Sequence, residues 1–234
     1  MRKEHKNLLE KIRKHRGKGT QHTSNDSYIL SGHFYYDVSV PVRRQIVKNW
    51  LKENKGISDK DFVAVLDSLY KGKSHEEKTV ASYLLSYHHP HRKTIKPKQL
   101  NKWLDHLVGW AEVDSLCQNV FTAEEILSDW KTWESFIEKL SKDKNINKRR
   151  ASLVLLTGPT YRSNDKRLRD LAFEMINTLK HEQPIIITKA ISWLLRDMSA
   201  KHKKAVSEYL KNNEDTLPKV AVRETQRKLK TGKK

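Results

Sequence analysis

Residues 58–69 read Ser-Asp-Lys-Asp-Phe-Val-Ala-Val-Leu-Asp-Ser-Leu, and this stretch decides the fold class. Its large apolar side chains are Phe62, Val65, Leu66 and Leu69. They recur at three- and four-residue spacing, which is the period of one face of an α-helix. Ser58 stands just before this pattern, where a hydroxyl can cap the first turn. The stretch therefore predicts an amphipathic helix that begins after Ser58.

The same spacing recurs along most of the chain. Only 8 Gly and 6 Pro occur in 234 residues, and strand-like alternation of apolar and polar residues is scarce. Further apolar stripes with this period lie within residues 80–87, 103–108, 133–140 and 171–179. The predicted fold class is therefore all-α.

Short polar breaks separate the predicted helices. They lie at residues 71–74, 89–91, 158–160 and 181–184. Short links favour antiparallel neighbouring helices. The three histidines within residues 88–91 do not repeat along one helix face and border Pro90, so we interpret them as a solvent-exposed turn rather than as metal ligands.

Small or pivotal residues recur in alternate predicted helices at intervals of 31 to 39 residues. They are Ala81, Asp114, Ala151, Ala190 and Ala221. Such an interval is typical of stacked two-helix repeats, which curve and leave one long concave face. We therefore predict an α-α superhelix, a solenoid of helical repeats with a concave basic face, and an irregular helical bundle is the alternative. One domain is expected over residues 1–229, followed by a basic tail at residues 230–234.

The charge of the chain predicts a polyanionic partner. Lys and Arg number 47 against 28 Asp and Glu, which gives a formal net charge of +19. This excess is larger than solubility requires, so nucleic acid is the first hypothesis. A basic surface without a dedicated partner is the alternative, and an anionic membrane surface is less favoured.

Several classes of protein are disfavoured by what the sequence lacks. A single cysteine, Cys117, excludes an internal disulfide and a site with several cysteine ligands. The sequence contains no apolar secretory core and no stretch long enough to span a membrane, so we expect a cytoplasmic protein. Gly-rich phosphate loops, HExxH and paired CxxC motifs are also missing. No cofactor and no metal are therefore predicted.

Three segments carry candidate site residues. In residues 107–117, Leu-Val-Gly-Trp-Ala-Glu-Val-Asp-Ser-Leu-Cys, Trp110 and Asp114 stand four apart and would share one helix face. Residues 148–156 place a Lys-Arg-Arg cluster at the start of an apolar helix, and residues 187–197 contain a second indole, Trp193. Taken singly, each of these features is more often core or solvated surface than a site.

Together, in this order, the segments resemble the DNA alkylation repair family of HEAT-like repeat glycosylases over most of the chain. The matching motifs are Trp-x-x-x-Asp-Ser, an Arg-Ala pair that opens an apolar helix, and Lys-Ala-Ile-x-Trp-x-Leu-Arg. Near the amino end, residues 28–34 and 38–45 look like the family's Tyr-containing segment followed by Pro-x-Arg-Arg.

Carried over by position, the resemblance implies that Asp114 is the catalytic carboxylate. It makes Trp110 and Trp193 the aromatic walls of the site, with Tyr28 completing the cleft, and it makes Arg150 a contact to the DNA backbone near the lesion. The remaining cations expected to neutralise phosphates are Arg43, Arg44, Lys48, Lys148 and Arg149. Where the family commonly has a glycine and then a polar amide, this chain has Asp37 and Ser39.

The resemblance implies a monofunctional glycosylase that excises cationic alkylated purines, of the 3-methyladenine and 7-methylguanine type, from duplex DNA in base excision repair. The expected partner is double-stranded DNA with alkylated bases, the expected state is a monomer, and the expected location is the bacterial cytoplasm near the nucleoid. Two alternatives remain open. One is a non-catalytic helical-repeat protein that binds DNA or senses damage, and the other is a scaffold for acidic proteins.

Overall fold

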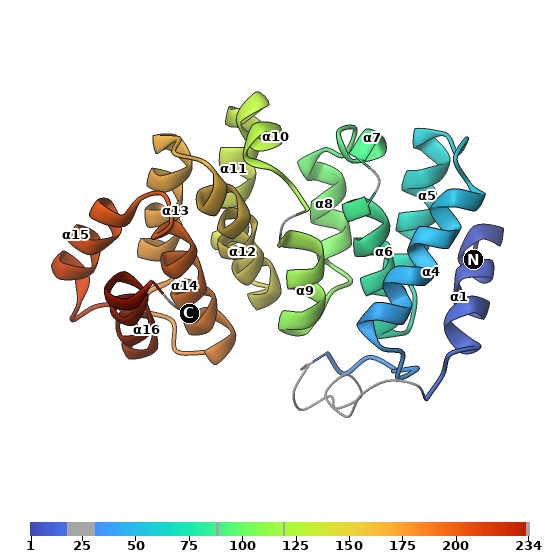
Figure 1. Cartoon of the computed structure of the whole chain (residues 1–234), viewed down its shortest axis with the longest axis horizontal. Helices are drawn as coiled ribbons and strands as arrows, with labels where there is room; N and C mark the ends of the chain where they lie inside the picture. Colours follow the sequence, from blue (N-terminus) through green and yellow to red (C-terminus); the bar gives the residue numbers. More distant parts are fainter. Residues whose placement is uncertain (18–30, 88, 119, 233–234) are drawn as a thin grey trace. The chain divides into compact units, whose positions relative to one another are not determined.

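The structure is a computed structural model that describes residues 1–17, 31–87, 89–118 and 120–232. Figure 1 shows that the described chain is built from helices. Within these residues the only strand-like feature is one isolated bridge between Phe34 and Ser74. The all-α prediction is therefore confirmed. The residues cluster into two units, Met1–Leu116 and Cys117–Lys234, and each is described by itself.

The first unit is organised around one central helix, α6. Its helices are α1 (Lys3–Arg13), α4 (Val40–Glu53), α5 (Asp59–Tyr70), α6 (His75–Tyr87), α7 (His89–Arg92), α8 (Pro97–Leu104) and α9 (Gly109–Cys117), whose last residue belongs to the second unit. Helix α6 packs against both α4 and α5, and α1 packs against the same two helices. Helix α6 is therefore the element on which the rest of this unit is built.

Helix α5 forms as its sequence predicts. The Ser58 hydroxyl accepts a hydrogen bond from the backbone N–H of Asp61 at 3.1 Å, so the predicted cap is present. The four apolar side chains of the stripe are all buried. Burial of each contributes roughly 1.5 to 3 kcal/mol to folding. Tyr70, at the end of α5, stacks on Trp103 of α8 with 5.0 Å between ring centroids, which joins the two helices.

The second unit is organised around the adjacent helices α12 and α14. Its helices are α10 (Ala123–Ser128), α11 (Trp130–Ser141), α12 (Ile146–Arg162), α13 (Lys166–Leu179), α14 (Ile185–Met198), α15 (Lys203–Asn213) and α16 (Lys219–Thr231). Helix α14 packs between α12 and α16. Ala151, Ala190 and Ala221 are fully buried, one in each of these helices, where a small side chain lets neighbouring helices approach closely. The superhelix and the single domain over residues 1–229 stay predictions.

The predicted break at residues 158–160 is wrong. Helix α12 continues through Pro159 to Arg162. A proline inside a helix costs about 3 kcal/mol because it removes one backbone N–H and crowds the preceding turn. Here residues 150–160 are all buried, and α12 packs against α11, α13 and α14. The apolar contacts of this central helix therefore outweigh the cost of the proline.

The interpretation of residues 88–91 as a solvent-exposed turn is wrong for His91. This imidazole is 8% exposed, and its Nδ1 hydrogen-bonds to the carboxylate of Asp59. Its ring stacks on Phe62 with 4.7 Å between centroids. An imidazole can bury its face against an aromatic ring while its nitrogen reaches a carboxylate, so the short helix α7 is fixed against α5.

Asp37 adopts a backbone conformation that favours glycine. Its φ is 60°, which lies in the left-handed region. The Glu76 carboxylate accepts hydrogen bonds from the backbone N–H of Tyr36 at 3.0 Å and of Val38 at 3.3 Å, on either side of Asp37. The turn is therefore held by a buried carboxylate, and the chain keeps a glycine-like conformation with an aspartate in place.

The left-handed backbone at Asp37 predicts how substitutions there affect stability. Asp37→Gly should leave a protein at least about 1 kcal/mol more stable than Asp37→Val, because a β-branched residue pays the full cost of the left-handed conformation, roughly 1 to 2 kcal/mol. Urea unfolding of the two variants measures the difference. Equal stability of the Gly and Val variants would contradict the left-handed backbone at this position.

Candidate active site

Helix α9 is a separate helix from α8, although the apolar stripe predicted at residues 103–108 suggested one continuous helix up to Val108. We expected residues 103–108 to form one helical stripe, but α8 ends at Leu104 and Val108 is 39% exposed. Residues 105–108 lie between the two helices, and Gly109 has a φ of 76°, in the left-handed region, so α8 and α9 cannot form one continuous right-handed helix. Helix α9 therefore starts in a new direction.

Trp110 and Asp114 both lie on α9, as predicted. Because they stand four residues apart, their side chains leave the helix on the same side. Both residues are half-buried, so neither is sealed inside the unit. Helix α9 thus presents an indole and a carboxylate together, from one short rigid element.

Glu112, between these two residues, anchors α9 to the interior. Its side chain is fully buried. It accepts hydrogen bonds from His33 Nδ1 at 2.9 and 3.1 Å, from His75 Nδ1 at 3.1 Å and from the backbone N–H of Val108 at 3.0 Å. Burial alone would raise the pKa of Glu112, but these bonds outweigh it and lower the pKa. The carboxylate therefore ties α9 to α6 and to the segment before α4.

The first turns of α6 form a second buried polar cluster. Glu77 accepts a hydrogen bond from His5 Nε2 at 2.7 Å, and both side chains are almost fully buried. The ammonium group of Lys78 donates to the carbonyls of Tyr70 at 2.9 Å and Gly72 at 2.8 Å, and burial lowers its pKa. Charged residues at the start of a helix are usually exposed, and nothing in the sequence indicates that Glu77 and Lys78 are buried.

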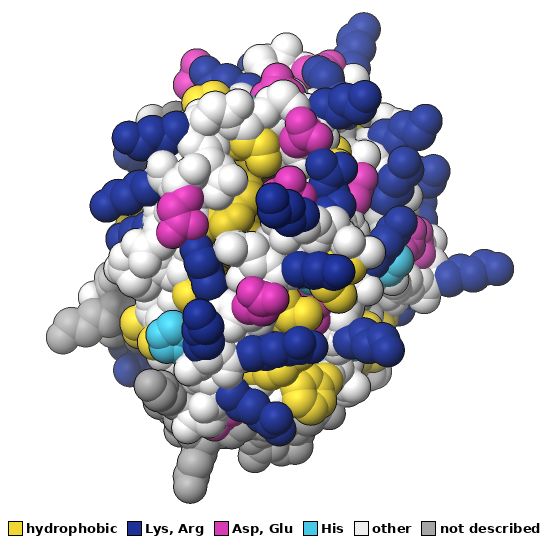
Figure 2. All heavy atoms as spheres, turned by 90° about the vertical axis from the view of Figure 1, so that its right-hand side faces the viewer, with side chains coloured by type: hydrophobic (Ala, Val, Ile, Leu, Met, Phe, Trp, Pro, Cys, Tyr) yellow, Lys and Arg dark blue, Asp and Glu magenta, His cyan; other side chains and the backbone are white. Residues whose placement is uncertain are grey.

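The three predicted phosphate contacts of the first unit lie on α4. Arg43 is 2% exposed and donates to the hydroxyl of Thr79 on α6. Arg44 and Lys48 are exposed. In Figure 2, which looks at the first unit from its amino-terminal side, Lys and Arg side chains are more frequent than acidic ones. The basic character expected from composition is therefore visible on this unit.

The predicted phosphate contacts of the second unit lie at the start of α12 and are all bonded to the protein. Lys148 is buried, and its Nζ forms an ion pair with Oδ2 of Asp143 at 3.6 Å. Arg149 binds the Glu182 carboxylate with two bonds of 2.7 and 3.1 Å. Arg150 is buried and donates to the carbonyl of Ile186, near the start of α14. Arg150 therefore joins α12 to the helix that carries Trp193.

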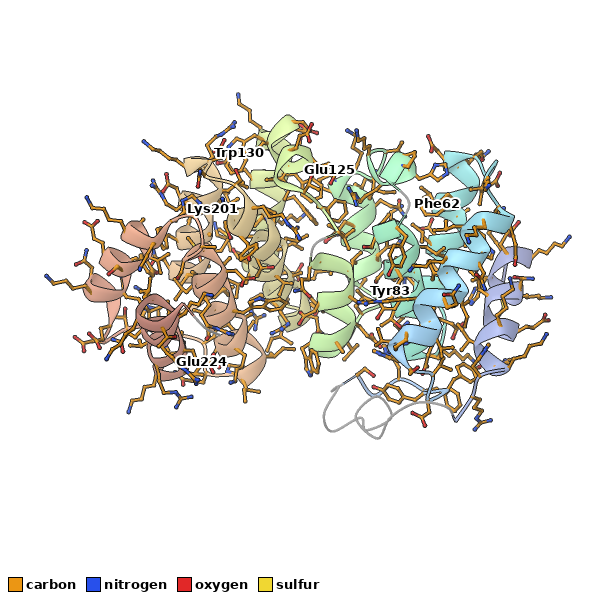
Figure 3. The ribbon with its side chains drawn as sticks, in the orientation of Figure 1. Phe62, Tyr83, Glu125, Trp130, Lys201 and Glu224 are labelled. Carbon is orange, nitrogen blue, oxygen red and sulfur yellow. The ribbon has the colours of Figure 1, made fainter. Side chains whose placement is uncertain are left out.

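Trp193 lies on α14 and is half-buried. Its indole N–H donates to the carboxylate of Asp197 at 2.8 Å, which fixes the plane of the ring. On the same helix, Ser192 donates to Glu224 of α16 at 2.5 Å, and Lys189 pairs with the same carboxylate at 3.2 Å. Glu224 is labelled in Figure 3. Sequence reasoning gave neither Asp197 nor Glu224 a role. Glu224 lies on another helix, at no fixed spacing, whereas Asp197 follows Trp193 by four residues on α14, a spacing that could have revealed the contact.

Three further observations concern Tyr28, metal binding and membrane spans. Tyr28, predicted to complete the cleft, lies outside the described residues. Among the described residues, no group of three His, Cys, Asp or Glu side chains is arranged to hold a metal ion. No helix of the described chain combines the length and the apolar composition that crossing a membrane requires.

The buried carboxylates make the stability of the first unit pH-dependent. The folded protein holds the pKa of Glu77 and Glu112 below the ordinary value of 4.5, since the hydrogen bonds outweigh burial. Their contribution is therefore complete above about pH 4.5 and is lost as the pH falls through the lower folded pKa. We expect the stability difference between the native chain and Glu112→Gln, measured by urea unfolding, to shrink below this pH. A difference that stays constant down to about pH 3 would contradict this linkage.

Comparison with known proteins finds a matching family and similar solved structures. A sequence model described as "DNA alkylation repair enzyme" matches residues 8–229. Among solved structures, the chain is similar to a "Predicted DNA alkylation repair enzyme from Enterococcus faecalis", with a TM-score of 0.67 and 20% identity, over 88% of this chain and 94% of that chain. At this identity the structural likeness shows the fold alone. No curated protein matches the chain.

Proposed function

This chain belongs to the DNA alkylation repair enzyme family, and on that premise we propose that it is a monofunctional glycosylase that releases cationic alkylpurines from duplex DNA. Membership of the family supports a role in the repair of alkylated DNA. The glycosylase chemistry, the substrate class and the site residues are our proposal. It assigns Asp114 as the catalytic carboxylate, with Trp110, Trp193 and Tyr28 as the aromatic groups around the substrate.

The chemistry of the substrate explains why one carboxylate suffices. A purine alkylated at N3 or N7 carries a positive charge, so it leaves as a neutral base when the glycosidic bond breaks, without a general acid. Positive charge then develops on the sugar, and a nearby carboxylate stabilises it electrostatically. The same carboxylate can orient or deprotonate the water that attacks the anomeric carbon. Asp114 is half-buried, so it combines restricted solvation with access from outside.

The indoles supply selectivity for charge. The face of a tryptophan ring attracts a cation by about 0.5 to 2 kcal/mol, depending on how well water is excluded. Trp110 and Trp193 are both half-buried, so each keeps part of its ring available to a ligand. The N–H of Trp193 is bonded to Asp197, so this ring is held in place before the substrate arrives. Neutral lesions should therefore be poor substrates.

The proposed contacts to the DNA backbone come from both units. They are Arg43, Arg44, Lys48, Lys148, Arg149 and Arg150. Arg44 and Lys48 are exposed and can reach phosphates directly. The cations of α12 are bonded to protein atoms, so they act mainly by their charge or after exchanging a partner. Such contacts give affinity that depends on salt and carries little sequence preference.

The observation that carries the proposal is the arrangement of α9. A carboxylate and an indole share its accessible side, while the opposite side is fixed by the buried Glu112. A fixed carboxylate beside an aromatic face suits a substrate whose reacting sugar and departing base are both cationic at some stage. A surface that only binds DNA has no need of this pair.

The test is release of 7-methylguanine and 3-methyladenine from methylated duplex DNA by the native chain. We expect both bases to be released and unmodified purines to be retained. Binding to DNA without release of either base would favour the non-catalytic damage-sensing alternative. Absence of DNA binding, together with capture of acidic proteins that does not depend on salt, would favour the scaffold.

A further inference from the structure

Three cations of α4 gather over two tyrosine rings of α6. The guanidinium carbon of Arg44 lies 5.5 Å from the centroid of the Tyr83 ring, and that of Arg43 lies 5.9 Å from the same ring. The ammonium nitrogen of Lys48 lies 5.6 Å from the centroid of the Tyr87 ring. Tyr83, labelled in Figure 3, is thus shared by two guanidinium groups. We name these five residues the cation–tyrosine patch.

The positive charge of this patch is not compensated within the protein. None of its three cations pairs with a carboxylate anywhere in the described chain. Arg43 is buried, and its Nε has no hydrogen-bond partner among the described residues. Arg167 provides a contrast. Arg167 lies 5.5 Å from the Trp130 ring but also pairs with Asp165 at 2.7 Å. The cation–tyrosine patch therefore concentrates positive charge that an external anion can neutralise.

The two exposed cation–ring pairs, Arg44 with Tyr83 and Lys48 with Tyr87, follow each other along the helices. Arg44 and Lys48 are four residues apart on α4, and Tyr83 and Tyr87 are four apart on α6, so the pairs follow each other at about 6 Å along the helix axes. Arg44 and Lys48 are both exposed. A ring beneath a long flexible cation limits its rotamers, which reduces the entropy lost when the cation binds an anion. The spacing suits an anion that itself repeats, such as a nucleic acid backbone.

We propose that the cation–tyrosine patch binds neighbouring phosphates of one strand of duplex DNA, and that Tyr83 and Tyr87 are its positioning residues. Arg44 and Lys48 contact the phosphates, and the buried Arg43 adds its charge from beneath. The identity of the partner rests on the proposed function. The role of the tyrosines goes beyond it, because it concerns how the cations are held and not the chemistry of base release.

The test is the salt dependence of binding to a short unmodified duplex. Each phosphate neutralised contributes about 0.9 to the slope of log K against log salt concentration. Arg44→Ala combined with Lys48→Ala should therefore reduce the magnitude of that slope by about 1.8. Tyr83→Leu combined with Tyr87→Leu should weaken binding roughly fivefold or more, because two cations that no ring holds in place lose more rotamer freedom on binding, while the slope changes much less.

Two matched variants control the test. Tyr83→Phe combined with Tyr87→Phe keeps both rings and should bind as the native chain does, which separates the ring from the hydroxyl. Arg167→Ala removes a cation that also lies over a ring but is paired with Asp165, and it should leave the slope unchanged. Circular dichroism and the unfolding midpoint of the Leu variant show whether it is folded. If the Leu variant is unfolded, the salt dependence of the Arg44→Ala, Lys48→Ala variant and the affinity of the Tyr83→Phe, Tyr87→Phe variant still test the proposal.

The outcomes separate this proposal from the proposed function. Native affinity in a folded Leu variant, weakened binding by the Phe variant, or an unchanged slope after removal of Arg44 and Lys48 would each overturn the cation–tyrosine patch. The expected slopes and affinities from a chain that releases no alkylated base would support the patch and overturn the glycosylase. Release of alkylated bases by the native chain, together with an unchanged slope after removal of Arg44 and Lys48, would support the glycosylase and overturn the patch.

Discussion

Asp114→Asn is expected to slow the release of 7-methylguanine and 3-methyladenine on the order of a hundred- to thousandfold. The amide has almost the same shape as the carboxylate but carries no negative charge to stabilise the developing positive charge on the sugar. Because α9 is fixed from its other side through Glu112, the substitution should not displace the helix. The measurement is the single-turnover rate of base release from methylated duplex DNA, together with the affinity for unmodified duplex, which should stay close to native.

The matched control for this prediction is Asp105→Asn. Asp105 is an exposed aspartate of the same unit, just after α8, and it is not among the proposed site residues. Its substitution removes the same charge from the protein and should leave the rate unchanged. Full activity in Asp114→Asn would show that this carboxylate is not catalytic, whatever the family. An equal loss in both variants would mean that net charge, and not position, sets the rate.

Glu112→Ala is expected to lower the free energy of unfolding by about 3 to 5 kcal/mol, as removal of one partner from a buried ionic cluster typically does. His75 would lose a buried acceptor, His33 and the Val108 N–H would lose theirs, and a cavity would open beneath α9. Urea unfolding at neutral pH measures the effect. A loss this large is a large fraction of the stability of a typical domain, so Glu112→Gln, which keeps the volume, serves as the milder second variant.

An exposed glutamate of the same unit provides the control for Glu112. Glu10 lies on the solvent side of α1, and Glu10→Ala should change stability little. If Glu112→Ala were as stable as Glu10→Ala, the hydrogen bonds that three donors make to Glu112 would contribute nothing net to stability. The role of Glu112 as the anchor of α9 would then be wrong.

Local rules predicted the helices where the sequence alone decides them. Ser58 caps α5 because a hydroxyl at that position meets the third backbone N–H after it, and the stripe from Phe62 is buried as its period requires. The same rules failed at Pro159, where tertiary burial of α12 overrides a local cost. They failed again at residues 103–108, where α8 ends at Leu104 although the apolar period continues to Val108.

The role of Glu112 in the candidate site could not be predicted. Trp110 and Asp114 were found from their spacing and from the family motif. Glu112, which anchors them, stands between the two in the sequence and still gave no signal, because its partners His33 and His75 lie 79 and 37 residues away in the chain.

By itself, the sequence determined the all-helical class, the cap at Ser58, the small residues at helix contacts and the positions of one carboxylate and two indoles. These depend on spacing within a few residues, and the period of the helix fixes that spacing. The tertiary structure decided which charged residues are buried and which stay exposed: Arg43, Lys78 and Glu112 lie inside, whereas Arg44 and Lys48 face solvent. Burial of a charge depends on partners from distant segments, and only the folded chain brings those together.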